Sequence, residues 1–133
     1  MITCRNDEFF TPGDRVISLV YNSPIIQIGT VGTIVNRWVG PLYAARLPNG
    51  EFYKWLAEED LRPADPGQHT LRVGDFAIID TRREDSFSNP FVVNGLVVQI
   101  IKIIGQTDYY GISVTGGNTN NAWLAGFDVS NVF

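Results

Sequence analysis

The sequence of 133 residues contains one cysteine, Cys4, and one histidine, His69. A single cysteine excludes a disulfide within the chain and any zinc site built on cysteines, and a single histidine excludes a metal centre with several histidine ligands. His69 has no nearby nucleophile in the sequence, and Cys4 has no cluster of cations that would activate its thiol. The sequence therefore predicts no metal, no cofactor and no enzymatic activity.

Long apolar runs and basic blocks are also missing. No apolar stretch approaches the ~20 residues of a membrane-spanning helix. Ten Lys and Arg stand against 14 Asp and Glu, and a net charge of -4 disfavours a nucleic-acid protein held by phosphate contacts. The N-terminal residues 1–8 are too polar and acidic for a signal peptide. With 44% hydrophobic and 18% charged residues, we expect a globular cytoplasmic protein.

Glycine and proline, 13 and seven residues respectively, divide the chain into short β-type runs without helix start and stop signals. The clearest signal is Asn49-Gly50, which favours a tight hairpin turn between strands at 43–47 and 51–56. Residues 57–60 are typical of one helical turn, with Asp60 as its cap and the acidic side chains in solvent. Trp38 to Leu42 is expected to be a loop. The pattern predicts an all-β fold.

The second half of the sequence repeats markers of the first half in the same order. The offsets are 61 residues for Gly13-Asp14 and Gly74-Asp75, 63 for Gly32 and Gly95, 67 for Tyr43 and Tyr110, and 68 both for Trp55 and Trp123 and for Asp60 and Asp128. Chance recurrence is the alternative to an internal repeat. We expect two small SH3-like barrels in tandem, residues 1–64 and 71–133, joined by a proline-containing linker at 65–70.

Two family resemblances follow from these residues. Residues 12–16 and 29–35, Tyr43, and residues 50–61 resemble the SH3-like repeats of the Mind bomb ubiquitin ligases and of short phage proteins of the YorP kind. The second half resembles the photosystem I reaction-centre subunit IV family, most closely at residues 118–125, where an Asn-Thr-Asn-Asn loop precedes an aromatic residue. The second resemblance implies an SH3-like barrel that helps dock ferredoxin.

Aromatic and asparagine side chains are the candidate contact residues. Large rings in the first half either fill a small core or face a partner, and Trp38, in its expected loop, either binds a partner or fills the space between the barrels. The asparagines after Gly117 either contact a partner or accept the backbone angles of a turn. The candidate partner-binding residues are Trp38, Tyr43, Tyr53, Asn118, Asn120 and Asn121.

We therefore expect a non-catalytic protein-binding module whose partner is another protein. Two alternatives stay open. One is an accessory subunit of a photosynthetic electron-transport complex, and the other is an SH3-like protein associated with nucleic acid. The sequence leaves the oligomeric state open.

Overall fold

A computed structural model describes residues 10–21, 26–68, 70–81, 91–114 and 120–132. Within these ranges the only helical segments are two three-residue 3-10 turns, and none is a helix long and apolar enough to cross a membrane. The elements are β1 (Arg15–Ser18), β2 (Val31–Arg46), β3 (Phe52–Ala57), η1 (Glu58–Asp60), β4 (Leu61–Pro63), β5 (Phe76–Ile79), β6 (Val97–Ser113), β7 (Ala122–Ala125), η2 (Gly126–Asp128) and β8 (Val129–Asn131). The all-β prediction is confirmed.

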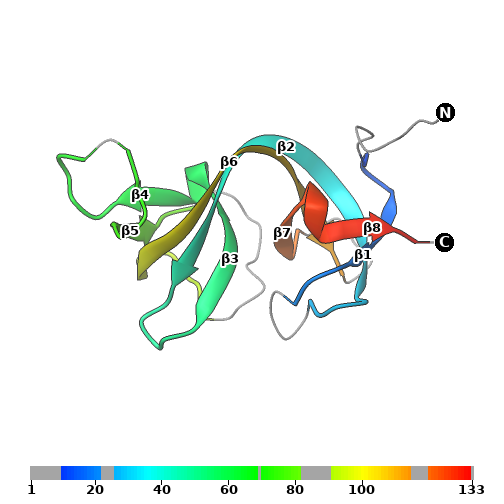
Figure 1. Ribbon diagram of the computed structural model, residues 1–133, viewed down its shortest axis with the longest axis horizontal. Coiled ribbons are helices and arrows are strands. Elements are labelled where there is room, and N and C mark those ends of the chain that lie inside the picture. The colour runs from blue at the N-terminus through cyan, green and yellow to red at the C-terminus, as the bar shows by residue number, and fades with distance from the viewer. Residues whose placement is uncertain (1–9, 22–25, 69, 82–90, 115–119, 133) are drawn as a thin grey trace.

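Two long strands, β2 and β6, form the centre of the sheet. They pair antiparallel from Thr33 opposite Ser113 to Arg46 opposite Gln99, and together they arch from one lobe to the other (Figure 1). β1 pairs with the start of β2, and β5 pairs with the start of β6. Because both long strands belong to both lobes, neither lobe is built from one continuous piece of the sequence.

The expected loop at Trp38 to Leu42 is wrong, because these residues continue β2. Trp38 pairs with Tyr109, and Gly40 pairs with Thr107. Pro41 lacks a backbone N–H, and the ladder shifts register between Gly40 and Leu42, which is where a strand can accept a proline. The partner strand supplies hydrogen bonds on both sides of the irregularity, so the strand continues through residues that favour a loop in isolation.

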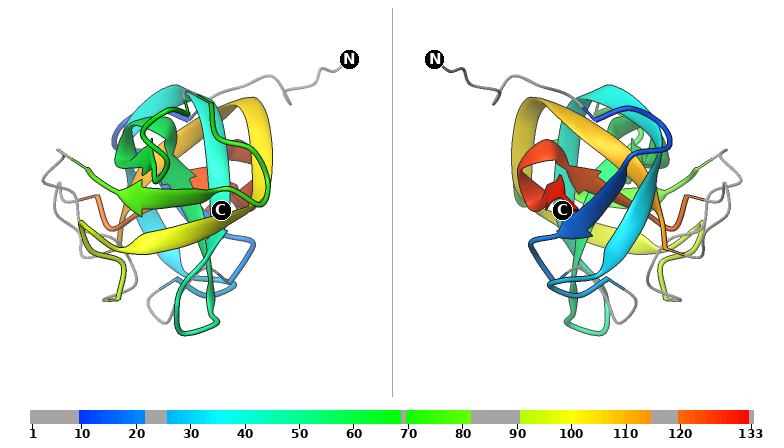
Figure 2. Two further views of the ribbon diagram at one scale, coloured as in Figure 1. Left: turned by 90° about the vertical axis from the view of Figure 1, so that its left-hand side faces the viewer. Right: turned by 90° about the vertical axis from the view of Figure 1, so that its right-hand side faces the viewer.

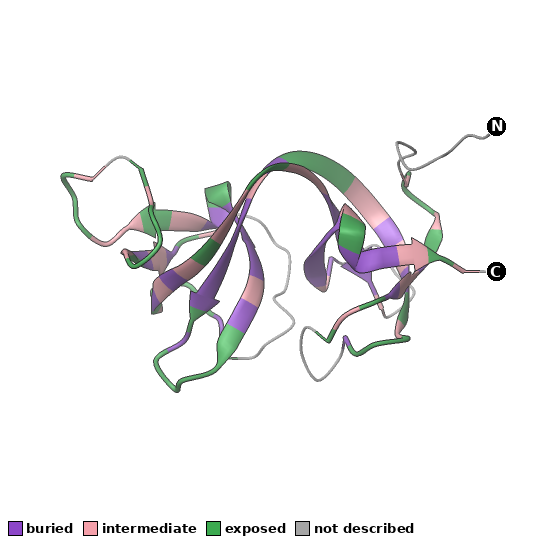
Figure 3. Ribbon diagram, viewed as in Figure 1, coloured by how far each residue is buried: buried purple, intermediate pink, exposed green. Residues whose placement is uncertain are grey.

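Each lobe has its own hydrophobic cluster. The cluster of what we name the Tyr43 lobe contains Tyr43, Ala45, Leu47, Tyr53, Leu56, Ala77, Ile79, Val92, Val98 and Ile100. The cluster of the Tyr110 lobe contains Val16, Ile26, Ile34, Tyr110, Ile112, Ala122, Leu124 and Val129. Figure 3 shows these buried residues inside each lobe, with a more exposed stretch where the arch crosses between them.

Both clusters take residues from both halves of the sequence. The strand pairs that complete the lobes do the same, since β1 lies against β8 and β4 lies against β5. The packed units therefore do not coincide with the expected barrels at 1–64 and 71–133. The physical reason is the length of β2 and β6, which carry the chain out of one lobe and into the other before it turns back.

The two lobes match each other position by position. Val16 pairs with Gly32 in one lobe, as Ala77 pairs with Val98 in the other, and Tyr43 faces Leu56 as Tyr110 faces Leu124. Figure 2 views the molecule from its two lobe ends (Figure 2). One sequence equivalence is wrong. Gly29, not Gly32, corresponds to Gly95, because both have φ near +90° and each donates its N–H to the last residue of an equivalent strand, Ser18 of β1 or Ile79 of β5.

The strand order is β4-β5-β6-β2-β1-β8, with β3 added to β2 and β7 added to β6. All pairs are antiparallel, and the described strands at the two ends of this order, β4 and β8, do not pair with each other. The sheet is therefore not closed, and the assignment of two SH3-like barrels stays a prediction.

Candidate functional site

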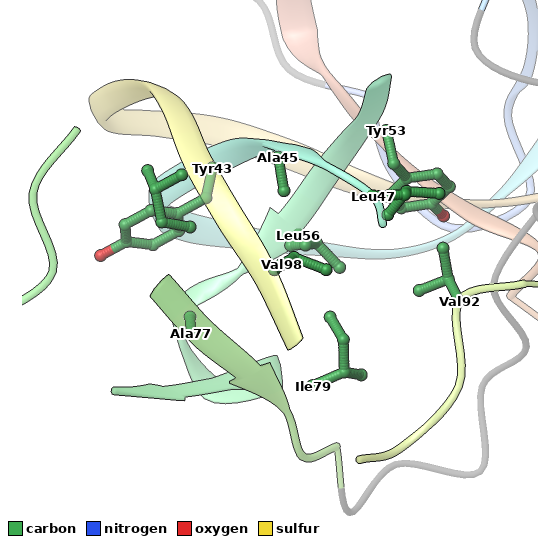
Figure 4. Close-up of a cluster of buried hydrophobic side chains, with 10 residues drawn as sticks. Tyr43, Ala45, Leu47, Tyr53, Leu56, Ala77, Ile79, Val92 and Val98 are labelled. Carbon is green, nitrogen blue, oxygen red and sulfur yellow. The ribbon is translucent and has the colours of Figure 1, made fainter. Parts of the chain in front are cut away.

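A pocket opens beside Tyr43, one of the candidate contact residues. Its volume is about 140 Å³, and it is lined by Tyr43, Glu58, Leu61, Pro63, Thr70 and Leu71. Tyr43 is 6% exposed and packs into the cluster of its lobe. Figure 4 shows its hydroxyl at the edge of the cluster, pointing away from Ala45 and Val98 (Figure 4). The pocket is thus a small recess lined by both polar and apolar side chains, with a phenol at its edge.

Local hydrogen bonds hold the walls of the pocket in place. The Asp60 carboxylate accepts the N–H of Ala57 at 3.2 Å and closes the 3-10 turn, which leaves Glu58 exposed. On the opposite wall, Asp75 Oδ2 accepts the N–H of Arg72 at 2.7 Å and fixes the turn that follows Leu71. Two short-range carboxylate caps, separated by 15 positions in the sequence, therefore position the two sides of the recess.

The charge in the pocket is negative. Burial raises the pKa of the Tyr43 phenol above 10.0, and the charge of Glu58 raises it further. The phenol therefore stays neutral at physiological pH and can donate or accept a hydrogen bond. None of the six lining residues is a cation, a nucleophilic cysteine or serine, or a histidine. The described lining offers hydrogen-bonding groups from Tyr43, Glu58 and Thr70.

Metal binding has no visible basis in the described ranges, where no three His, Cys, Asp or Glu side chains are grouped to hold an ion. Cys4 and His69 lie outside the residues that the structure describes. The acidic turn was expected to be wholly in solvent. Glu58 and Glu59 are exposed, whereas Asp60 is buried and accepts the indole N–H of Trp123 at 3.2 Å.

Trp38 lies away from the pocket, on the exposed arch. It is 40% exposed, its Nε1 donates to Asn36 Oδ1 at 2.9 Å, and its ring stands edge-on to Trp123 with 6.3 Å between ring centroids. Both roles considered for Trp38, contact with a partner and filling of the space between the lobes, are therefore compatible with its position. One side of the ring covers the cluster between the lobes, and the other side is accessible.

Two further candidates are structural residues. Tyr53 is 1% exposed and packs in the Tyr43 lobe, so it offers no surface to a partner. Asn120 is also 1% exposed, and its Oδ1 accepts the N–H groups of Ile112 at 3.2 Å and Ala122 at 3.0 Å. A buried amide that satisfies two backbone donors stabilises the strand pair. The burial of Tyr53 and Asn120 supports a structural role and not the expected contact with a partner.

The remaining candidate asparagines are Asn121 and Asn118. Asn121 is half-buried, and its Oδ1 accepts the N–H of Val114 at 2.9 Å, which again completes a backbone hydrogen bond. Asn118 lies outside the described residues. The structure therefore brings neither Asn120 nor Asn121 to the pocket, whose described lining residues come from 43 to 71.

A surface that sequence reasoning missed crosses the outside of the Tyr43 lobe. Phe52 on β3 pairs with Arg46 on β2, Arg46 pairs with Gln99 on β6, and Gln99 pairs with Phe76 on β5. We name these four residues the outer row. Phe52 is 63% exposed and Phe76 is 53% exposed, and the Arg46 guanidinium lies 5.3 Å from the centroid of the Phe52 ring. In β5 Phe76 lies on the opposite face from Ala77 and Ile79, but all four residues of this strand are apolar, so the sequence pattern gave no signal of which one is exposed.

A third cluster joins the two lobes, and it contains both buried tryptophans. Its members are Leu42, Ala44, Trp55, Ala57, Tyr109, Trp123 and Ala125. Trp55 Nε1 donates to Asp128 Oδ2 at 2.7 Å, the counterpart of the bond from Trp123 to Asp60. Each 3-10 turn therefore carries a buried aspartate that accepts a tryptophan from the other half of the sequence.

Comparison with known proteins gives a fold and no family. No family model matches the sequence, and no curated protein matches it. The crystal structure of the DUF1541 family protein YdhK from Bacillus subtilis is similar with a TM-score of 0.66 and 20% identity, over 96% of this chain and 88% of that chain. A solution structure of the YdhK C-terminal domain is similar with a TM-score of 0.61 and 21% identity, over 92% and 93% of the two chains.

A second crystal structure of B. subtilis YdhK has a TM-score of 0.60 at 21% identity, over 90% of this chain and 98% of that chain. At these identities the similarity shows the fold alone. The Mind bomb, YorP and photosystem I subunit IV resemblances receive no support from these comparisons.

Proposed function

We propose that this chain is a non-catalytic protein-binding module and that the outer row is part of its contact surface. The observation that supports this proposal is a difference between the lobes. Phe76, Gln99 and Arg46 correspond by strand register to Arg15, Thr33 and Ser113 of the Tyr110 lobe. The same fold is built there without an aromatic ring, so folding does not require Phe76 on that face.

The composition of the outer row favours a protein partner. Aromatic and arginine side chains are enriched at the centres of protein interfaces, whereas nucleic-acid surfaces need several cations to neutralise phosphates. The outer row has one cation, Arg46, and the whole chain has a net charge of -4. Exposed phenyl rings on rigid strands are also pre-organised, which lowers the entropic cost of binding.

Capture from a lysate of the native host tests this proposal. The bait proteins are the wild type, a double variant with Phe52→Ser and Phe76→Arg, and a control with Ile28→Ser, which removes a 74% exposed side chain from the other lobe. We expect a partner that the wild type and the control retain and that the double variant loses by at least tenfold. Retention by the double variant would show that the outer row is not the contact.

The nucleic-acid alternative has its own test. Titration with single- and double-stranded DNA at two salt concentrations should show no tight binding, and tight binding that weakens steeply with salt would overturn the proposal. The photosynthetic alternative depended on the asparagine loop, in which Asn120 and Asn121 bond to backbone N–H groups. No described residue favours that alternative, and the cytoplasmic location stays a prediction.

A further inference from the structure

The pocket beside Tyr43 has a filled counterpart in the other lobe. Tyr43 and Tyr110 occupy the same strand position, because Tyr43 faces Leu56 and Tyr110 faces Leu124. Leu71 and Phe10 also correspond, because each directly precedes the same kind of turn. After Leu71 the N–H of Arg72 donates to Asp75, and after Phe10 the N–H of Thr11 donates to Asp14. The two lobes therefore differ at this point by a leucine in place of a phenylalanine.

In the Tyr110 lobe the phenylalanine makes two contacts with the tyrosine. The N–H of Phe10 donates to the Tyr110 hydroxyl at 3.3 Å, and the two rings stand edge-on with 5.4 Å between centroids and 77° between planes. This is a favourable aromatic geometry. In the Tyr43 lobe, Leu71 packs against the cluster, but within the described residues no group forms a hydrogen bond with the Tyr43 hydroxyl. The contacts of Phe10 with Tyr110 therefore serve as the template for a ligand of the Tyr43 recess.

The size of the recess agrees with one aromatic ring. Its volume is about 140 Å³, and an apolar cavity of about 150 Å³ in another protein binds benzene. The walls contributed by Leu61, Pro63 and Leu71 are apolar, which suits a phenyl side chain. The recess therefore has about the volume of one aromatic ring and an apolar side for a phenyl group to contact.

The charge at the recess selects among aromatic ligands. Glu58 lines the recess and is exposed. Among the described lining residues, none is a cation that would offset this charge. A basic residue beside the aromatic one is therefore favoured over an acidic residue, because opposite charges attract across the rim.

We propose that the Tyr43 recess binds a phenylalanine of a partner peptide that also carries an adjacent arginine or lysine, with the peptide N–H donating to the Tyr43 hydroxyl and the cation facing Glu58. This site shares no residue with the outer row, so it goes beyond the proposed function by assigning a second, sequence-selective contact.

NMR titration of the full-length protein with blocked dipeptides tests the site. The probes are N-acetyl-Phe-Arg-amide, N-acetyl-Phe-Glu-amide and N-acetyl-Ala-Arg-amide. We expect saturable shifts at Leu61, Thr70 and Leu71 with the Phe-Arg probe, binding at least threefold weaker with Phe-Glu, and no saturation with Ala-Arg. Glu58→Gln should reduce the difference between Phe-Arg and Phe-Glu to less than twofold.

The two lobes provide matched variants. Leu71→Phe gives the recess the residue of the other lobe and should weaken Phe-Arg binding at least tenfold, while Leu71→Met, which keeps the volume, should retain it. Phe10→Leu should open a second recess and produce a second set of shifts around Tyr110. Unchanged binding by Leu71→Phe, or the absence of saturation with the wild type, would overturn the proposal.

The double variant of the outer row separates this inference from the proposed function. Phe52→Ser with Phe76→Arg should bind the Phe-Arg probe as the wild type does, even where it loses the protein partner. Loss of the probe in that variant would place the probe on the outer row and overturn the assignment to the recess.

Discussion

The indole N–H of Trp55 donates to Oδ2 of Asp128 across 73 positions of the sequence, at 2.7 Å inside the protein. Trp123 makes the reciprocal bond to Asp60 at 3.2 Å, across 63 positions. Each aspartate also accepts the backbone N–H three residues before it, at Ala57 and Ala125. One buried carboxylate therefore closes a 3-10 turn in its own half and holds a tryptophan of the other half.

Replacing Asp128 by alanine should destabilise the protein strongly. The change leaves two buried donors, Trp55 Nε1 and the N–H of Ala125, without their acceptor, and each such loss costs about 1–3 kcal/mol. Urea denaturation measures the free energy of unfolding. Asp128→Asn keeps one acceptor oxygen and should cost less, and an alanine variant within about 0.5 kcal/mol of the wild type would contradict the role of this carboxylate.

Cutting the chain between Pro66 and Gly67 should give two fragments that fold only together. Each hydrophobic cluster draws on both fragments, and the β2–β6 ladder joins them along its whole length. Circular dichroism should show each fragment unfolded alone and native structure after mixing, with a one-to-one complex on size-exclusion chromatography. Cooperative thermal unfolding of residues 67–133 alone would show that one half of the sequence is a sufficient folding unit.

Tyr43 should make the stability of the protein depend on pH in the alkaline range. Its folded-state pKa is raised above 10.0 by burial and then by Glu58. The stability contributed by the neutral phenol is complete below the unfolded value of about 10 and is lost as the pH rises through the folded value. Unfolding free energies between pH 9 and pH 11 should fall more steeply for the wild type than for Tyr43→Phe, and equal slopes would refute the shift.

Adding a single methyl group at Gly111 should destabilise the Tyr110 lobe. A Cβ there would lie 2.5 Å from Asn36 Oδ1 and 2.8 Å from Asn120 Nδ2, and Asn120 has two backbone N–H groups to satisfy. Forcing this contact should cost about 1–3 kcal/mol. Gly105→Ala is the control, because nothing lies within 4 Å of its Cβ, and it should leave stability unchanged or raise it by up to about 1 kcal/mol. Equal melting temperatures for the two variants would contradict this packing.

Local features of the fold were predictable from the sequence. The Asn49-Gly50 turn forms as expected, with Gly50 at φ +90° and Leu47 bonded to Glu51 at 2.8 Å, because the residues that make it are neighbours. The 3-10 turn at Glu58–Asp60 and the strand that follows it were predictable for the same reason. In these places propensity and tertiary structure agree.

The course of β2 and the exchange between halves depend on distant partners. Gly40 and Pro41 favour a break, and only β6, more than 60 positions away, keeps the strand continuous. The pairing of β1 with β8 likewise brings the two ends of the sequence together, and no local pattern encodes it. The markers that showed the same order in both halves could not show which half completes which lobe.

The candidate site was only partly predictable. Aromatic content identified Tyr43, but Leu71, which lines the recess beside it, is seen to correspond to Phe10 only when the halves are aligned at an offset of 61. Tyr53 and Asn120 were selected by residue type, and burial decided their roles. The pattern of its strand does not identify Phe76, because all four residues of β5 are apolar and only the structure shows which of them face outward.

The arch of β2 and β6 also limits how the molecule can open. One lobe cannot open by releasing a single continuous segment of the sequence. Its central strands are parts of β2 and β6, and the remaining parts of the same two strands belong to the other lobe. We therefore expect local fluctuations at the edges and at the exposed crossing, whereas the amides of β2 and β6 buried within the two lobes should exchange with solvent only when the whole chain unfolds. Hydrogen exchange of these buried amides would accordingly report the same free energy of opening in both lobes.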